Sequence, residues 1–328
     1  MERPYRLVTR LDPPNSAGTP VAPYRRFVAR SADGDRTVLF SAPHPGGDPA
    51  LFRAEAEVAQ RLTAPWTLPV NAVSGTDDAW FTHPYVPALP LPVALAVHGG
   101  PLPEGTVRVI GAALAETLAA LHAQGVTHAG VAPAAVLLTA DGPLLTCFGA
   151  ARSTDRVDRE AQAPERTAGA APAAPGTPAA APRAPGTQTA APAGPGTPTA
   201  APMAPGTPTA PPAGPGSPAA APADAPHDVY GLGAVLAYAA TGYTVPERSE
   251  LPDALRATIT ACLTRDPAQR PAAAALPAAL APPAPHGTVL GSAASLLTPG
   301  WLPARVVAAL AHQSASLLAA DLPVPNGS

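Results

Sequence analysis

The chain has no lysine: all 20 of its basic residues are arginine, in a sequence of 328 residues. Arginine does not freely replace a lysine that makes a point contact, because its guanidinium group is planar, bulkier and differently hydrated. Chemistry that depends on a lysine side chain is therefore excluded. The formal net charge of −3 gives no electrostatic reason to bind an anionic polymer or surface. We expect neither a nucleic acid partner nor a membrane partner.

Cysteine is scarce as well, and Cys147 and Cys262 have no spacing typical of metal ligands. The eight histidines show no ligand pairing, so we expect no metal site. The first residues lack the apolar core of a signal peptide. No uninterrupted apolar run of about 18 residues occurs, and the alanine-rich stretch 107–121 contains Arg108 and Glu116, which favours a buried globular helix. These absences predict a cytoplasmic protein.

Apolar patterns divide the chain into a β-rich first part and a helical second part. Short β-type runs occur at 26–29, 37–40 and 79–82. The segment 51–62 has helical spacing, which would turn Leu51, Val58 and Leu62 inward. Further helices are expected at 104–122, 229–240, 252–263 and 303–318. We expect the last of these to pack on the helical part, and a helix that binds a partner is the alternative.

The segment 171–220 consists of five copies of a ten-residue unit such as APAGPGTPTA. Each copy carries two to four prolines and almost no large apolar residue, so stacked copies would bury very little surface. The composition predicts a disordered spacer that favours the polyproline II conformation. A docking ligand is the alternative, and the Thr-Pro and Ser-Pro steps at Thr177, Thr197, Thr207 and Ser217 are candidates for regulation.

The stretch 121–152 reads LHAQGVTHAGVAPAAVLLTADGPLLTCFGAAR. It resembles the catalytic core of actinobacterial-type serine/threonine protein kinases, in which H-R-D-x-K-P-x-N precedes a strand pair and D-F-G. His128 takes the histidine place, Pro133 the proline place, and Phe148 and Gly149 complete the last motif. The resemblance implies structural roles for His128 and Phe148 in a hydrophobic spine, and Glu55 matches the helix glutamate of the first lobe.

Three later segments resemble the same family in the right order: A-P-E at 163–165, DVYGLGAVL at 228–236 and CLTRDPAQRP at 262–271. The resemblance implies that Arg270 pairs with Glu165 and that Asp228 anchors the catalytic-loop backbone. The implied fold is α+β and bilobal, with a small β-rich N-lobe and a larger helical C-lobe. We expect the N-lobe at 1–86, the C-lobe at 87–165 and 227–283, the disordered insertion at 166–226 and a helical extension at 284–328.

The residues that would perform phosphate transfer differ from the family pattern. A single glycine among prolines, in LDPPNSAGTPVAPYRR at 11–26, stands where a glycine-rich loop would cover the phosphates. The places of the strand lysine, the catalytic aspartate, the loop lysine, the metal-binding asparagine and the D-F-G aspartate carry Ser41, Gly130, Ala132, Ala135 and Cys147. These side chains offer neither the oxygen ligands that magnesium prefers nor a base.

The resemblance also implies a hinge at 83–86 and a slot for adenine, with walls at Leu39, His83, Tyr85 and Leu137. Any ATP bound there would bind weakly, and magnesium is not expected as a cofactor. The sequence therefore predicts a pseudokinase, a catalytically inactive binding or regulatory module in cytoplasmic signalling with an unknown protein partner. One alternative is an atypical serine/threonine kinase that binds ATP and transfers phosphate by a non-standard site. Another is a decaying gene product without a role.

Overall fold

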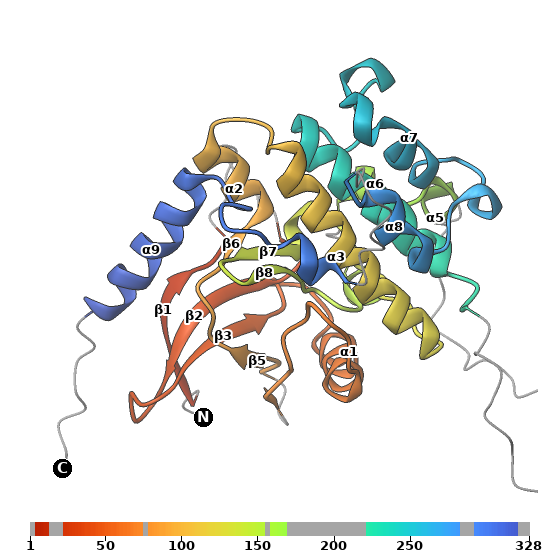
Figure 1. Cartoon of the computed structure of the whole chain (residues 1–328). Coiled ribbons are helices and arrows are strands. Elements are labelled where there is room, and N and C mark those ends of the chain that lie inside the picture. Colours follow the sequence, from red (N-terminus) through yellow and green to blue (C-terminus); the bar gives the residue numbers. More distant parts are fainter. Residues whose placement is uncertain are drawn as a thin grey trace, which may run out of the picture. The chain divides into compact units, whose positions relative to one another are not determined.

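The computed structural model describes residues 4–12, 22–74, 78–154, 158–168, 221–282 and 292–320 (Figure 1). The chain divides into two units, one formed by Met1–Ala168 with Ala219–Ser328 and the other by Gly169–Pro218. The second unit lies outside the described residues. The disorder predicted for the decapeptide repeats therefore stays a prediction, and all that follows concerns the first unit.

The N-lobe contains a five-stranded antiparallel sheet in the order β1-β2-β3-β5-β4. The predicted strands at 26–29 and 37–40 are confirmed within β2 and β3, whereas Ala79 and Trp80 precede β5 instead of lying in it. The tight turn at Gly34 sets the register of the β2–β3 hairpin, which places Arg26 opposite Ser41. The strands are β1 Tyr5–Arg10, β2 Arg25–Ser31, β3 Thr37–Ala42, β4 Ala72–Val73 and β5 Phe81–Pro84.

Helix α1, Pro49–Arg61, lies beside this sheet, next to β5 (Figure 1). Asp48 caps its first turn, since the carboxylate accepts from two backbone N–H groups, and proline follows at the first helical position. The helix buries Phe52 and Ala56, and the Phe52 ring stacks on Phe81 at 5.1 Å. The predicted inward face was wrong: Leu51 is 49% exposed, because the aromatic side chain one residue later occupies the core.

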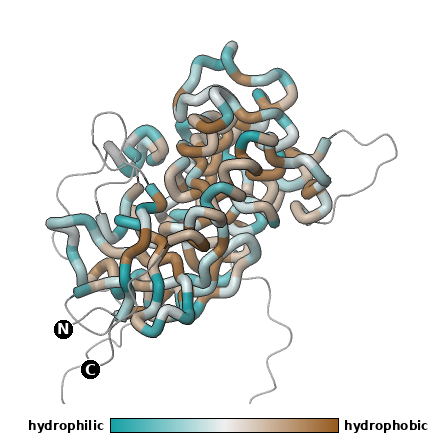
Figure 2. The backbone as a smooth tube through the Cα atoms, turned by 90° about the vertical axis from the view of Figure 1, so that its left-hand side faces the viewer, coloured by the Kyte–Doolittle hydropathy of each residue, from teal (hydrophilic) through white to brown (hydrophobic). Residues whose placement is uncertain are grey.

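The C-lobe is mainly helical and carries a second small antiparallel sheet, in the order β6-β7-β8. In Figure 2 hydrophobic backbone segments run through the interior of this helical part, and hydrophilic segments lie toward its outside. The main elements are α2 Leu91–His98, α3 Glu104–Ala123, α6 Ala225–Thr241, α7 Asp253–Cys262, α8 Leu276–Leu280, β6 Leu89–Pro90, β7 Val136–Thr139 and β8 Gly142–Leu145. Shorter helices are α4 Ala150–Ser153 and α5 Pro164–Ala168, with 3-10 turns at Pro133–Ala135, Arg159–Ala161, Arg248–Glu250, Pro267–Gln269, Ala273–Ala275 and Ala293–Leu296.

Helix α3 forms the centre of the C-lobe core. Its Leu114 and Leu118 are fully buried, and a Cβ atom at Gly111 would lie 2.8 Å from Leu236 of α6, so glycine permits the close crossing of the two helices. Among the described residues α3 has the length and composition to cross a membrane, but 78% of the relevant window is buried inside the fold. This burial is typical of the core helix of a globular domain.

Helix α9, Ala304–Leu318, runs beside α2 and past the edge of the N-lobe sheet (Figure 1). It buries Val306, Leu310 and Leu317. Arg305 Nη1 donates to the His98 carbonyl at the end of α2, at 3.3 Å. The prediction of a helix packed on the C-lobe is confirmed, and α9 also contacts the connection between the lobes.

Candidate functional site

Asp228 anchors the loop in which the kinase resemblance places the catalytic residues. It lies in the first turn of α6 and is 2% exposed. One carboxylate oxygen accepts from the His128 backbone N–H at 2.7 Å, and the other accepts from the Ala129 backbone N–H at 2.8 Å. The imidazole Nε2 of His122 lies 3.0 Å from the first of these oxygens. Asp228 thus holds the loop in place, the role that the resemblance implies.

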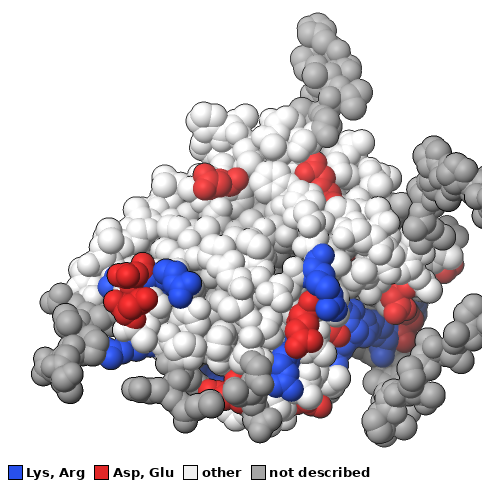
Figure 3. Space-filling model, turned by 90° about the horizontal axis from the view of Figure 1, so that it is seen from below, with Lys and Arg blue, Asp and Glu red and all other residues white. Residues whose placement is uncertain are grey.

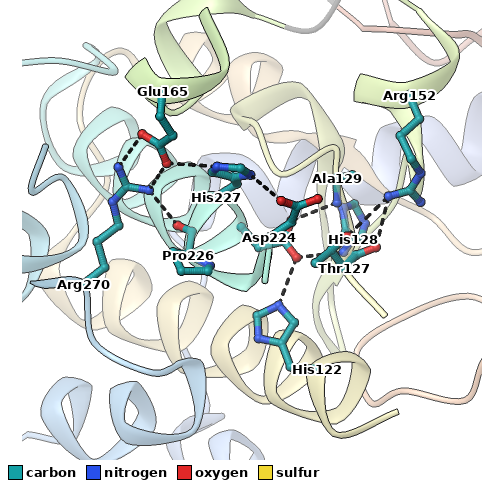
Figure 4. Close-up of polar contacts among 11 residues, drawn as sticks. His122, Thr127, His128, Ala129, Arg152, Glu165, Asp224, Pro226, His227 and Arg270 are labelled. Atoms are coloured by element: carbon teal, nitrogen blue, oxygen red, sulfur yellow. Dashed lines mark hydrogen bonds and ion pairs between the residues drawn. The ribbon is translucent and has the colours of Figure 1, made fainter. Parts of the chain in front are cut away.

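Glu165 and Arg270 form another charged contact of the C-lobe (Figure 4). The two guanidinium nitrogens donate to the two carboxylate oxygens at 2.6 and 2.8 Å, a bidentate geometry. Arg270 also donates to the carbonyls of Pro226 and Thr264, so it joins α5, the start of α6 and the segment after α7. Partial burial acts to raise the pKa of Glu165, but the hydrogen bonds and charge of Arg270, a backbone hydrogen bond and the nearby His227 together outweigh it, so the pKa is lowered.

His128 and Phe148 lie edge to face, with ring centroids 5.7 Å apart. His128 is 2% exposed, and burial lowers its pKa to about 4 although Asp228 partly opposes the shift. The imidazole is therefore neutral near pH 7. Both rings belong to the packing between α1, the loop and the C-lobe, which agrees with a structural role for the pair.

Gly130 occupies the place where the family carries its catalytic aspartate, and this place has no room for a side chain. A Cβ atom there would lie 2.3 Å from the backbone carbonyl of Cys147 and 3.1 Å from the Ala150 side chain. The two segments meet this closely because Ala129 and Cys147 both adopt left-handed backbone conformations, with φ of 51° and 63°. Such conformations are costly for residues other than glycine, so the surrounding contacts must hold them.

Glu55 has a cationic partner, which the sequence did not reveal. Its carboxylate accepts from Arg152 Nε and Nη2, both at 2.7 Å, and the Arg152 side chain is 34% exposed. A Cβ atom at Gly149 would lie 2.1 Å from Glu55 Oε2. Arg152 can reach back to α1 because it follows the Phe148–Gly149 pair closely.

Arg26 was not among the predicted site residues, yet it lies at the centre of the site. The side chain leaves β2 opposite Ser41 and is 5% exposed. Its Nη2 donates to the Ala134 carbonyl at 2.7 Å, and Nη1 donates to Thr146 Oγ1 at 3.0 Å. Its Nε donates to Asp12 Oδ2 at 2.7 Å. The register of the β2–β3 hairpin is the sequence signal that could have placed this cation next to Ser41.

Arg26 stands where phosphates and metal ions would be expected from the resemblance. Ala135 and Cys147, at the places of the two metal ligands, are buried beside its contacts with Ala134 and Thr146. Ala132 is buried too and offers no polar side chain. Within the described segments no group of three or more histidine, cysteine, aspartate or glutamate side chains could hold a metal ion.

The four predicted walls of the adenine slot come together, but they leave little space between them. Leu39, His83 and Leu137 line a common cavity of about 10 Å³, which is room for about one water molecule. Tyr85 packs against the cluster formed by Leu11, Val28, Leu39, Ala88, Leu137 and Leu317. His83 Nδ1 donates to the Pro69 carbonyl at 2.9 Å, and burial lowers the pKa of His83.

Comparison with known proteins relates the chain to bacterial kinases. It is 30% identical over 305 residues to the probable serine/threonine-protein kinase PkwA of Thermomonospora curvata, which covers 79% of this chain and 34% of that protein. It is 28% identical over 305 residues to the serine/threonine-protein kinase AfsK of Streptomyces coelicolor, covering 86% of this chain and 32% of that protein. A stretch of 111 residues is 36% identical to the serine/threonine-protein kinase PknD of Mycobacterium tuberculosis and covers 32% of this chain. No family model matches the chain.

The chain belongs to the bacterial serine/threonine protein kinase family. The order of the sheet, the loop anchored by Asp228 and the Glu165–Arg270 pair are the features of the bilobal kinase-like α+β fold that the sequence predicted. The chain spans about a third of the length of the first two relatives, at 34% and 32%. The kinase activity in the names of these relatives is a property of those proteins.

Proposed function

We propose that this kinase-family chain is a pseudokinase, a module that transfers no phosphate and acts in cytoplasmic signalling by binding another protein. The observation that carries the proposal is the contact between Gly130 and Cys147. A carboxylate at position 130 would have to occupy space that the Cys147 carbonyl already fills. The base that orients the attacking hydroxyl in protein kinases therefore has no counterpart in this geometry.

The electrostatic groups of phosphate transfer are replaced as well. Ser41 carries no charge, and Ala135 and Cys147 provide no oxygen ligand for magnesium. The guanidinium of Arg26, paired with Asp12, occupies the space beside these positions. Preorganised charges of this kind contribute about 3 kcal/mol each to stabilising a transition state, so their combined loss removes most of the rate. The proposal includes at most weak ATP binding that does not depend on magnesium.

Radiolabelled ATP tests the proposal directly. The purified chain, incubated with ATP, magnesium or manganese and general protein acceptors, should give no label above a buffer blank. A Leu39→Trp variant, which would fill the slot further, serves as the matched control because it should behave like the original chain. Label that follows the chain through purification and is lost in this variant would show the alternative, an atypical kinase.

The atypical kinase would need a cation for the phosphates, and Arg26 is the residue placed to supply one. Its side chain reaches the segment after β8, where Thr146 lies, from the strand opposite Ser41. However, its hydrogen bonds are already made to groups of the chain itself. This geometry favours the pseudokinase.

The proposed partner is a protein, whose binding does not require a surface with charges of one sign. On the face shown in Figure 3, arginines and acidic residues lie next to one another in mixed groups, separated by wide uncharged areas. The described residues on that face form no basic patch of the kind that binds nucleic acid. We place the proposed role in the cytoplasm, as the sequence predicts.

A further inference from the structure

The Arg26 side chain has no hydrogen-bond donor left for a ligand. A guanidinium group carries five N–H donors. Nε and Nη2 each meet one carboxylate oxygen of Asp12, Nη2 also meets the Ala134 carbonyl, and Nη1 meets Thr146 Oγ1 and, at 3.8 Å, Cys147 Sγ. Five contacts therefore account for the five donors.

The carboxylate of Asp12 also balances the positive charge of Arg26 with a negative one. The two side chains are 5% and 11% exposed, and a buried cation is stable only when it is paired and hydrogen-bonded. Burial acts to lower the pKa of Arg26, but the nearby Asp12 carboxylate outweighs it, so the pKa is raised and the guanidinium stays charged. An incoming phosphate would have to break this bidentate pair before it could contact the guanidinium.

The contacts of Arg26 cross from one lobe to the other. Asp12 follows β1 and Arg26 lies on β2, both in the N-lobe, whereas Ala134 and Thr146 flank β7 and β8 of the second sheet. Nucleotide phosphates would have to lie between these same segments. The side chain therefore fills the phosphate end of the slot and ties its two sides together.

Helix α9 closes the other end, beside the hinge. Leu317 belongs to the same buried cluster as Leu11, Leu39 and Leu137. One turn earlier, the Gln313 side chain accepts from the Ala88 backbone N–H and donates to the Ala88 carbonyl, both at 3.0 Å. The Leu317 carbonyl accepts from Arg30 on β2, also at 3.0 Å, so the end of α9 is attached to both lobes.

We propose that this chain closes its own nucleotide slot, with Asp12 and Arg26 as a latch across the phosphate end and Leu317 of α9 packed at the hinge end. Removing the latch opens the slot to a nucleoside triphosphate. The inference does not rest on the proposed function, because a chain without catalytic groups could still hold an open slot.

Cys147 is a reporter of the latch that requires no activity. The residue is 4% exposed, and its thiol contacts Arg26 Nη1 and has a pKa raised by burial. The thiol should therefore react slowly with iodoacetamide while the slot is closed. Alkylation rates of Cys147 and Cys262 can be followed separately by peptide mass spectrometry. Cys262 is 0% exposed in α7, away from the slot, and reports whether the chain stays folded.

Arg26→Ala should raise the alkylation rate of Cys147 at least tenfold and leave that of Cys262 unchanged. The matched control is Arg25→Ala, which removes the neighbouring guanidinium and its bond to the Pro43 carbonyl but keeps the latch. In Arg26→Ala, ATP should slow the alkylation of Cys147 again, with or without magnesium. In the original chain ATP should have no effect.

Three results would overturn the inference. One is a Cys147 rate that is equal in the original chain and in a folded Arg26→Ala chain; another is no effect of ATP on the opened variant. The third is protection of Cys147 by ATP in the original chain and its loss in Arg26→Ala, because Arg26 would then be a phosphate ligand. If Cys262 also reacts in Arg26→Ala, that variant has lost its fold. Asp12→Asn, which keeps the shape of the site, is then tested in the same way. Phosphate transfer is not measured, so either proposal can fail alone.

Discussion

The C-lobe anchor around Asp228 and the proposed closed slot around Arg26 both bury charged side chains, but the partners of these charges differ. Asp228 accepts hydrogen bonds from backbone N–H groups of the C-lobe, and Arg270 donates to the backbone carbonyl of Pro226, two residues before Asp228. These contacts stabilise the fold whether or not phosphate is transferred. The charges of a nucleotide slot, by contrast, are satisfied only when nucleotide and metal are bound.

This difference accounts for which charges the chain keeps. A buried lysine or metal-binding aspartate without its ligand would cost several kcal/mol in the folded state. In the slot those places carry Ser41, Ala135 and Cys147, and the remaining cation, Arg26, has an internal counter-ion in Asp12. The anchor, whose charges have permanent partners, needs no such change. Substitutions in the two regions should therefore act differently, the first on stability and the second on access to the slot.

The largest loss of stability is expected for Asp228→Ala. It would leave the N–H groups of His128 and Ala129 buried without an acceptor, along with His122. Each unsatisfied buried donor costs about 1–3 kcal/mol, so unfolding in urea should show a loss of about 5 kcal/mol. The control is Asp253→Ala, whose side chain is 89% exposed in an i,i+3 pair and should change stability by less than about 0.5 kcal/mol. Similar losses of stability for the two variants would mean that the hydrogen bonds of Asp228 do not stabilise the C-lobe.

A smaller loss is expected for Arg270→Ala. The guanidinium is fully buried, but its partner Glu165 is 27% exposed and can be solvated again when the pair is broken. The free energy of unfolding should fall by about 3–4 kcal/mol, near the lower end for a buried pair. Arg248→Ala, in the 3-10 turn before α7, is the matched control and should show almost no change in the melting temperature. A negligible shift for Arg270→Ala would mean that the pair does not hold α5 to the C-lobe.

Acid should weaken the packing between the two regions through His128. Its pKa is about 4 in the folded chain, because of burial, and about 6.5 when unfolded. The stability contributed by the neutral imidazole is therefore complete above about pH 6.5 and is lost as the pH falls toward 4. Between pH 7 and 4 the original chain should lose about 2–3 kcal/mol more than His128→Leu.

The control for this titration is His312→Gln, an exposed position on α9, which should keep the full acid dependence. Urea unfolding at a series of pH values measures all three chains. Parallel pH curves for the original chain and His128→Leu would show that the imidazole is not buried in its neutral form.

The parts of the molecule that the sequence predicted are those set by local pattern. Motifs with fixed spacing located Asp228, Glu165 and Arg270, and each makes the contact expected of it. Alternation and helical spacing located β2, β3 and the long helices. In α1, however, the predicted inward residue Leu51 is exposed, and its neighbour Phe52 is buried instead. Amphipathic patterns with few apolar residues leave such a choice to tertiary packing.

The slot was harder to predict because its contacts join distant segments. Arg26 is separated by 108 residues from Ala134 and by 120 from Thr146. Nothing in the local sequence indicates that an arginine on β2 crosses to the second sheet. The partnership of Glu55 with Arg152, 97 residues away, was missed for the same reason.

The smallest effect is expected from removing the decapeptide repeats at 171–220. The two ends of the insertion are held close together by the anchor, since Glu165 Oε1 lies 3.1 Å from His227 Nε2. A shortened connection can therefore span the gap. Closing a flexible loop costs about 0.6 kcal/mol per doubling of length, so going from roughly 60 residues to roughly 15 should stabilise the fold by about 1 kcal/mol or leave it unchanged. Urea unfolding of the shortened chain beside the full chain measures the difference, and trypsin should cut the full chain mainly after Arg183, with Arg183→Ala as the control. An insoluble or loosely packed product would mean that the repeats pack on the kinase-like fold and are needed for its stability.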